Sequence, residues 1–337
     1  MKSIYGITRK KLEEYFLSNN DKKFRATQIF EWLYRKNVKS FDEITNVNKD
    51  TINKLKEDFS FTDINIIKKQ EDKDVKKYLF ELSDGNKIES VVMYHDYGIS
   101  ICISSQIGCN MGCAFCESGR LKKVRNLNVD EMLLQVLKAQ EDIGERISHV
   151  VIMGIGEPFD NYDNVVDFIN IINDDYALAI GARHITVSTS GIVPKIYEFA
   201  REFSQVNLAI SLHAPTNEIR DKIMKVNKAY NIDEIMKAVK EYIKITNRKV
   251  TFEYIMLENV NDSEECAIKL ANLIRGLNAY VNLIPYNETN NIGFKRSNTS
   301  QITKFYDILK KENINVTIRR EFGSKVSAAC GQLRSES

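Results

Sequence analysis

The chain has 337 residues, 43% of them hydrophobic, which is enough for one large core and a small second one. Its net charge of +2 is too small to indicate a nucleic-acid partner by itself, and six cysteines without a disulfide framework are typical of a reducing compartment. The N-terminus lacks an apolar signal core and no run approaches the roughly 18 apolar residues of a membrane span, so we expect a cytoplasmic protein with no membrane partner.

Residues 1–70 carry apolar positions at helical spacing and predict a small helical accessory domain. Basic residues crowd this region at 9–11 and 22–25, so we expect the domain to bind RNA. The candidate core residues of this domain are Phe30, Trp32, Leu33 and Tyr34. The segment 79–95 predicts a hairpin, because Asp84-Gly85-Asn86 supplies a turn between two apolar runs. We therefore assign residues 71–97 to a β-hairpin extension.

From residue 98 onward, apolar strands alternate with amphipathic helices. The candidate strands are 100–106, 148–154, 184–190, 206–212, 249–257 and 281–286. Strands of this kind, each followed by a helix, predict a parallel sheet covered by helices. The fold class is α/β: a partial (β/α)6 barrel over residues 98–287, then a C-terminal helix, strand and mobile tail over 288–337. Functional residues in such folds lie at the carboxyl ends of strands.

Cys109, Cys113 and Cys116 follow the first of these strands in a C-x3-C-x2-C pattern. Thiolates at this spacing can hold three irons of a [4Fe–4S] cluster, and the lack of a fourth cysteine nearby leaves one iron open to a small ligand. A structural zinc site would require four closed ligands, normally in two pairs. Three clustered loop thiols do not pack a core, so the pattern favours a cluster that binds and reduces S-adenosylmethionine.

Small polar residues follow four of the predicted strands. The run Gly154-Ile155-Gly156-Glu157-Pro158 lacks the dinucleotide pattern, but its amides can approach a ligand closely, and Glu157 can accept from an amino group. The other strand ends supply Ser188-Thr189-Ser190-Gly191, Ser211-Leu212-His213-Ala214-Pro215 and Asn287. Together they predict a site for a polar cofactor such as S-adenosylmethionine. His213 alone would be a structural histidine, but its place in this ring makes it a ligand candidate.

Two further features point to RNA and to a nucleophile. Directly after the three cysteines come four cations, Arg120, Lys122, Lys123 and Arg125, which would neutralise phosphates near a reaction centre. Cys330 lies in a Gly/Ser-rich loop near Arg319 and Arg320, and cationic neighbours favour a nucleophilic thiolate. Cys266 is expected to be an ordinary buried cysteine. For Cys102 the pattern alone does not decide between a buried core cysteine and a functional thiol.

The cysteine spacing resembles the radical S-adenosylmethionine superfamily, and further motifs narrow the resemblance to the RlmN/Cfr family. These motifs are Cys102 to Cys109, Gly154 to Pro158, Ser188 to Gly191, Ser211 to Pro215, Asn282 to Asn287 and Ala328 to Leu333. The resemblance runs from about residue 22 to residue 333. It implies an enzyme that methylates an adenosine of 23S ribosomal RNA, using a [4Fe–4S] cluster and two molecules of S-adenosylmethionine per turnover.

The resemblance also implies the role of each site residue. Cys109, Cys113 and Cys116 would bind the cluster. S-adenosylmethionine would be bound by Gly156, Glu157, Ser188, Ser211, Leu212, His213 and Asn287.

The same resemblance assigns the chemistry to three residues. Cys330 would accept a methyl group from one cofactor molecule, and reductive cleavage of a second would give a radical that takes hydrogen from this methyl group. The carbon radical would add to the adenine ring and link enzyme to RNA. Cys102 would then attack the sulfur of Cys330 and release the product through a transient disulfide, with Glu89 as the general base.

Within the family the motifs are mixed. The N-terminal half resembles RlmN, which acts at adenine C2, whereas the tail is more similar to Cfr, which acts at C8 and confers resistance to ribosomal antibiotics. The segment 117–127 departs from both patterns. We expect C2 methylation, with C8 as the alternative.

The implied partners are 23S rRNA, bound before ribosome assembly is complete, and an electron donor such as flavodoxin or ferredoxin. Whether tRNA is a further substrate stays open. The enzyme is expected to be a monomer. A non-catalytic RNA-binding or zinc protein is the rival from another class, since it needs only the basic runs and three thiols. A radical enzyme acting on a protein or small molecule is a second rival, but it leaves Cys102 and Cys330 without a role.

Overall fold

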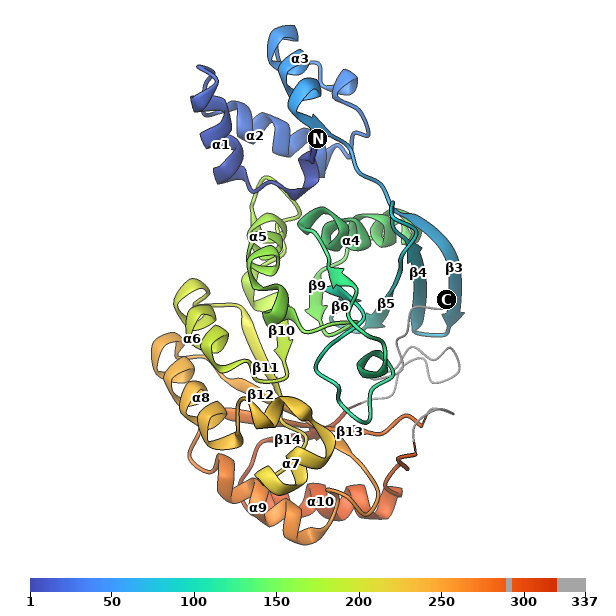
Figure 1. The fold of residues 1–337 in the computed structure, drawn as a ribbon, viewed down its shortest axis with the longest axis vertical. Helices are drawn as coiled ribbons and strands as arrows, with labels where there is room; N and C mark the ends of the chain where they lie inside the picture. Colours follow the sequence, from blue (N-terminus) through green and yellow to red (C-terminus); the bar gives the residue numbers. More distant parts are fainter. Residues whose placement is uncertain (289–292, 320–337) are drawn as a thin grey trace.

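Ten strands form one sheet in the computed structural model, which describes residues 1–288 and 293–319 (Figure 1). The strand order is β14-β13-β12-β11-β10-β9-β6-β5-β4-β3. Neighbours from β14 to β6 are parallel, whereas β5, β4 and β3 are antiparallel. The bounds are β3 Asn65–Asp72, β4 Val75–Glu81, β5 Lys87–His95, β6 Gly98–Ile103, β9 His149–Ile152, β10 Ile185–Thr189, β11 Asn207–Ser211, β12 Val250–Met256, β13 Ala279–Pro285 and β14 Val316–Ile318.

The six strands expected from the sequence correspond to β6, β9, β10, β11, β12 and β13, so the partial (β/α)6 barrel is confirmed. The predicted hairpin is also present: β4 pairs with β5, and Gly85 turns the chain with φ +79°. This hairpin extends the barrel sheet beyond β6, which places Glu89 on a strand continuous with the parallel core.

Helices lie on the outer side of the parallel strands. They are α4 Val129–Ile143, α5 Tyr162–Asn173, α6 Val193–Glu202, α7 Asn217–Ile223, α8 Ile232–Thr246, α9 Glu264–Ile274 and α10 Thr299–Lys311. The long helices α4 and α8 each begin with a capping box, in which an asparagine and a glutamate satisfy the free amides of the first turn. Strand residues that face the helices, such as Ile101, Val150 and Leu208, are fully buried. They form one apolar core with the helices.

Side chains alternate along each strand, so a second set, partly polar, points to the inner side of the same strands. Ser100, Thr186, Asn207 and Thr251 all lie on this side and line one cavity. Within the described residues, no helix is both long and apolar enough to span a lipid bilayer.

The N-terminal region is helical, as expected, and lies at one end of the molecule, next to α4 and α5 (Figure 1). It contains α1 Arg9–Ser18, α2 Arg25–Phe30, α3 Lys49–Asp58 and a two-stranded sheet of β1 Lys2–Ser3 and β2 Phe59–Ser60. Phe30, Leu33 and Tyr34 are buried, but Trp32 is only partly buried and the Lys36 ammonium lies 3.4 Å from its ring centroid.

Polar contacts anchor this region to the outside of the barrel. Arg9 Nε donates to Asp174 at 2.7 Å, and the Thr62 hydroxyl donates to Asp130 at 2.6 Å. Asp174 caps α5 and Asp130 lies in the first turn of α4, so the helical region is held against these two barrel helices.

Candidate active site

The loop that carries the three cysteines is closed at its base by a short ribbon. β7 (Gln106–Ile107) pairs with β8 (Arg125–Asn126), and the Cys109 amide donates to Leu121 O at 3.0 Å. Gly108 has φ +72°, and a Cβ there would lie 2.3 Å from Lys122 O. A side chain at this position would therefore force the ribbon apart.

Arg125 links this loop to two neighbouring elements. Its guanidinium makes a bidentate pair with Glu131, at 2.7 Å to each oxygen, and contacts Asp84 in the hairpin turn at 2.7 Å. Glu131 belongs to the capping box of α4. The cysteine loop, the hairpin and the start of α4 thus share one cation.

The three cysteines open into one cavity inside the barrel mouth, which we call the central cavity. Its lining includes five further residues expected from the sequence: Gly156, Glu157, Ser188, Ser211 and His213. Leu212 and Asn287 are not among the lining residues. The Leu212 side chain is fully buried in the apolar core, and its carbonyl accepts from Arg220 Nε at 3.1 Å. Asn287 is half-buried just beyond the end of β13.

The cysteines have the chemistry that a [4Fe–4S] cluster requires. All three are free thiols, and burial raises the pKa of Cys109 to about 12 and that of Cys113 well above its usual value. A buried thiol loses its proton only beside positive charge, which iron supplies. Binding of the cluster should therefore release the protons of these thiols. Among residues 1–288 and 293–319, no three His, Cys, Asp or Glu side chains gather around a single metal ion. The thiolates that hold a [4Fe–4S] cluster lie further apart than the ligands of a single metal ion, because each thiolate binds a different iron.

Glu157 and Ser190 form a polar wall opposite the cysteines. The Glu157 carboxylate accepts from Phe159 N at 3.0 Å and from Ser190 N at 2.6 Å, while burial raises its pKa. The Ser190 side chain is buried beside the same carboxylate and partly offsets this rise in pKa. A buried carboxylate and hydroxyl in this wall fit a polar ligand such as S-adenosylmethionine.

Gly156 lets this wall approach the cysteine loop. It has φ +112°, and a Cβ there would lie 2.6 Å from Gln106 Cβ. Gln106 Oε1 accepts from Glu157 N at 2.9 Å. The strand end and the base of the cysteine loop are therefore in direct contact.

Ser188 and Ser211 lie on the neighbouring strands β10 and β11, with their hydroxyl oxygens 3.4 Å apart. His213 follows in a left-handed conformation with φ 57°. Its Nδ1 accepts from Ile255 N at 3.1 Å, so the proton of the neutral ring is on Nε2. Burial, together with the charge of Arg220, lowers the pKa of His213 to about 3.

Arg220 is a structural centre of the site that sequence reasoning missed. It is fully buried, and its guanidinium donates to the carbonyls of Leu212, Ser190 and Ser211 at 3.1, 2.5 and 3.3 Å. Burial lowers its pKa to about 10, so it remains a cation at neutral pH. Within the sequence it is one arginine of a short amphipathic helix, a pattern that predicts a solvent-exposed side chain.

A second cavity, of about 650 Å³, continues from the central cavity along the inner side of the strands. Three of its lining residues are His95, His149 and His184, and we call it the histidine-lined cavity. The two cavities share Met153, Glu253 and Arg319. Sequence reasoning missed Glu253, whose carboxylate accepts from Asn282 Nδ2 at 2.9 Å and whose pKa is raised by burial.

Cys102 lies beside this junction. It is buried on β6, opposite Val91 and Val151, and packs with Met93 and Met153. Because Met93, Val151 and Met153 line the histidine-lined cavity, the thiol lies immediately behind its wall.

Glu89 lies on β5, two residues before Val91 and on the same face. Its carboxylate pairs with Lys77 Nζ at 2.6 Å, with side-chain exposures of 2% and 6%. Lys77 was not expected from the sequence, because a lysine in a hairpin strand normally faces solvent. Cys330 lies in the segment 320–337, outside the described residues, and Arg319 is the last described residue before it.

Comparisons with known proteins identify the family. A model of the Radical SAM superfamily matches residues 103–271, and a model described as the ribosomal RNA large subunit methyltransferase N-terminal domain matches residues 2–60. A radical SAM methyltransferase from Sphaerobacter thermophilus superposes with a TM-score of 0.92 at 38% identity, covering 100% of both chains.

Curated relatives agree along the whole chain. A protein of Spiroplasma citri named probable dual-specificity RNA methyltransferase RlmN is 53% identical, covering 100% of this chain and 98% of its own length. One of the same name from Enterococcus faecalis is 54% identical, covering 99% and 96%. These relatives are enzymes by name, which removes the alternative of a non-catalytic RNA-binding or zinc protein. The chain belongs to the RlmN family of radical S-adenosylmethionine RNA methyltransferases.

Proposed function

We propose that this protein methylates C2 of an adenosine in 23S ribosomal RNA in the cytoplasm, and that it also modifies tRNA. One observation carries the proposal: the three cysteines and the expected cofactor residues line one cavity, which shares its wall with a second cavity beside Cys102 and Arg319. The name of the relatives supports two RNA substrates, and the N-terminal match supports ribosomal RNA. Since the matched relatives carry the RlmN name over the full chain, we favour C2 and expect no antibiotic resistance.

Cys109, Cys113 and Cys116 would hold a [4Fe–4S] cluster, which when bound supplies the electron that cleaves S-adenosylmethionine. Glu157 accepts hydrogen bonds from the ammonium group of this cofactor. The hydroxyls of Ser188 and Ser211 bind its polar atoms, and His213 donates from Nε2 because its Nδ1 already accepts a backbone amide.

In this proposal Arg220 is a positioning residue. It holds the carbonyls of Ser190, Ser211 and Leu212, and thereby fixes the strand ends on which the cofactor residues lie. A buried cation that donates to several carbonyls has few alternative arrangements, so the binding wall is formed before the cofactor arrives.

Methyl transfer would use the two thiols in turn. The Cys330 thiolate attacks the methyl carbon of one S-adenosylmethionine and releases S-adenosylhomocysteine. The S-CH2 radical then adds to the adenine ring carbon. This carbon loses its hydrogen as a proton, which Glu89 accepts, and the adduct gives up one electron to an external acceptor. The Cys102 thiolate attacks the sulfur of Cys330; the sulfur–carbon bond breaks as the disulfide forms, and the released carbon takes up a proton to become the methyl group of the product.

The position of Glu89 suits this role. Lys77 at 2.6 Å offsets the cost of burying a charged carboxylate, so an ionised base is held away from water near Cys102. We infer that the target adenosine enters through the histidine-lined cavity. Its volume is in the range of small-ligand sites, and Arg183 and Arg319 at its wall suit a phosphate.

The test is nucleoside analysis of RNA from a host that lacks its own C2 and C8 enzymes and expresses this chain. We expect 2-methyladenosine in 23S rRNA and in a subset of tRNAs, located by mass mapping of RNA fragments. Exclusive 8-methyladenosine together with antibiotic resistance would overturn the C2 assignment while leaving the family unchanged.

A further inference from the structure

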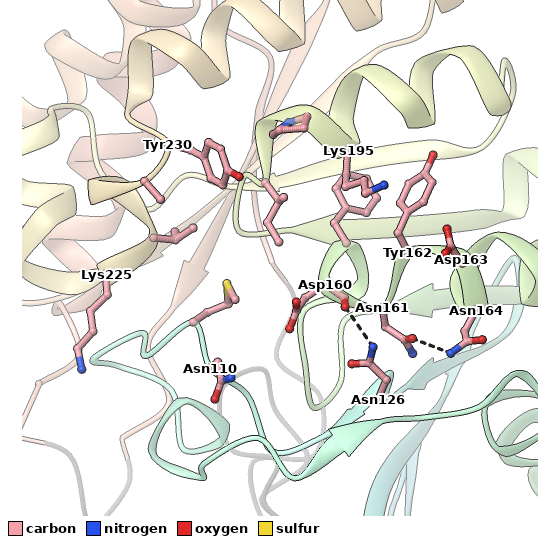
Figure 2. Close-up of a pocket in the computed structure, with 16 residues that line it drawn as sticks. Asn110, Asn126, Asp160, Asn161, Tyr162, Asp163, Asn164, Lys195, Lys225 and Tyr230 are labelled. Atoms are coloured by element: carbon pink, nitrogen blue, oxygen red, sulfur yellow. Dashed lines mark hydrogen bonds between the residues drawn. The ribbon is translucent and has the colours of Figure 1, made fainter.

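A third pocket, of about 770 Å³, lies on the outer side of the cysteine loop (Figure 2). We call it the outer pocket. Its walls come from the cysteine loop, the start of α5, the start of α6 and the short helix η7 (Lys225–Lys228). The proposed reaction at the central cavity gives this pocket no role.

One side chain separates the outer pocket from the central cavity. Among the described residues, Met111 is the single lining residue that the two share, and it lies in the loop between Cys109 and Cys113. A carrier seated in the outer pocket would therefore be about one side chain from a cluster held by these cysteines. The histidine-lined cavity instead meets the central cavity at Met153, and within the described chain it shares no lining residue with the outer pocket.

The floor of the outer pocket is a connected hydrogen-bond network. Asp160 Oδ2 accepts from Gln106 Nε2 at 2.9 Å and from Lys123 Nζ at 2.7 Å, and its carbonyl accepts from Asn126 Nδ2 at 3.2 Å. Asn164 Nδ2 donates to Asn161 Oδ1 at 2.8 Å (Figure 2). This network ties the floor to the ribbon of the cysteine loop, so a partner meets a preformed surface.

Exposed lysines lie at the edge of the outer pocket. Lys225 is exposed, and its stem lies over Gly112, where a Cβ would come 2.9 Å from Lys225 Cδ. The lining residue Asn110 accepts from Lys123 N at 3.3 Å, and on either side of Lys123 the side chain of Lys122 is exposed and that of Val124 is 64% exposed. Asp163 and the paired Asp160 are the acidic residues in the lining. Exposed lysines at the edge of a preformed pocket fit a partner that presents acidic side chains.

We propose that the outer pocket and its rim of Lys122, Val124 and Lys225 dock an acidic one-electron carrier protein, which reduces the cluster across Met111. The inference rests on the proposed function, because a cluster that cleaves S-adenosylmethionine must receive an electron for each cleavage. A reduced flavoprotein would pass from hydroquinone to semiquinone as the cluster gains one electron. The carrier and the RNA would approach the central cavity from different walls, so both can be bound at once.

The test compares Lys225→Glu with Lys244→Glu, a matched charge reversal on α8, where the lysine side chain is 76% exposed. The probe is a recombinant bacterial flavodoxin in its hydroquinone form. Binding to metal-free protein is measured by titration at low and physiological salt, and reduction of the reconstituted cluster is followed by stopped-flow absorbance. We expect Lys225→Glu to weaken binding and slow reduction by roughly tenfold at low salt, and Lys244→Glu to change neither.

The dithionite-driven reaction separates this proposal from the proposed function. Lys225→Glu should methylate RNA normally with dithionite, since this reductant needs no docking site. If the unmodified protein fails to methylate RNA with dithionite, the proposed function is overturned. The docking site is still tested in that case, because flavodoxin binding is measured separately. Equal flavodoxin affinity of both variants would overturn the docking site. Weakened binding of a 23S rRNA fragment by Lys225→Glu, with flavodoxin binding unchanged, would assign the rim to RNA instead.

Discussion

The two sides of the candidate active site are built differently. On the side of β10 to β12, the candidate cofactor residues are held by backbone donors and by the buried Arg220, so each position has several supports. On the side of β5 and β6, Glu89 pairs with Lys77, and Cys102 packs in a small apolar cluster. Substitutions on the binding side should therefore lower the activity by degrees, whereas substitutions on the chemical side should abolish one step of the reaction.

The largest effect is expected at the cysteine loop, which serves both sides. Replacing Cys109, Cys113 or Cys116 with Ala should abolish iron binding and deoxyadenosine formation, because no other cysteine lines the central cavity in the described chain. Iron content and chromatography of deoxyadenosine measure the result. Cys266→Ala, a change at a buried cysteine in α9, is the control and should retain both. Cleavage of S-adenosylmethionine by any of the three variants would contradict the cluster assignment.

On the chemical side, the two thiols should fail in different ways. Cys102→Ala should trap a protein–RNA adduct that migrates slowly on a denaturing gel and collapses with ribonuclease, since only release is blocked. Cys330→Ala should give neither adduct nor product while its cluster still assembles, and the double variant should behave in the same way. Normal turnover of Cys102→Ala without an adduct would make this thiol a core residue.

The pair of Lys77 and Glu89 separates stability from catalysis. Lys77→Met leaves a buried carboxylate without its partner and should lower the free energy of unfolding by about 3–5 kcal/mol. Adding Glu89→Gln should restore most of this loss, because the unpaired charge is removed. Urea unfolding measures the recovery, and a methylation assay with dithionite should show no turnover in the double variant. Turnover by the stable double variant would show that Glu89 is not the base.

The smallest effect is expected on the binding side, at His213. Its pKa is 6.5 in an unfolded chain and about 3 in the folded one, so below pH 6.5 the unfolded state binds a proton that the folded state refuses. Stability should therefore fall as the pH drops from 6.5 toward 3, by about 2 kcal/mol at pH 5. Urea unfolding of metal-free protein at pH 7 and pH 5 measures this loss, which His213→Gln should lack. Equal losses in both proteins would mean that the histidine is accessible to protons.

The sequence predicted the parts of the site that follow from periodicity. Strand ends at Gly156, Ser188, Ser211 and His213 could be found because parallel strands end on one edge of the sheet. Leu212 was expected from the family resemblance rather than from periodicity; its side chain lies in the apolar core, and its role in cofactor binding stays a prediction.

Arg220, Lys77 and Glu253 could not be found in this way. Each acquires its role from a partner on another element, and periodicity assigns a face without assigning a partner. In a single sequence, a buried cation has the same signature as an exposed one.

The contacts of Arg125 give iron loading a mechanical consequence. One guanidinium joins the cysteine loop to the turn of the β4–β5 hairpin and to the first turn of α4, so the strand that carries Glu89 is braced by the loop that receives the cluster. Assembly of the metal centre should then slow amide hydrogen exchange in the hairpin, which itself carries no expected iron ligand. The iron-free protein would be less rigid around Glu89 and also unable to transfer electrons. Cluster assembly would therefore prepare the general base and the electron-transfer centre in a single event.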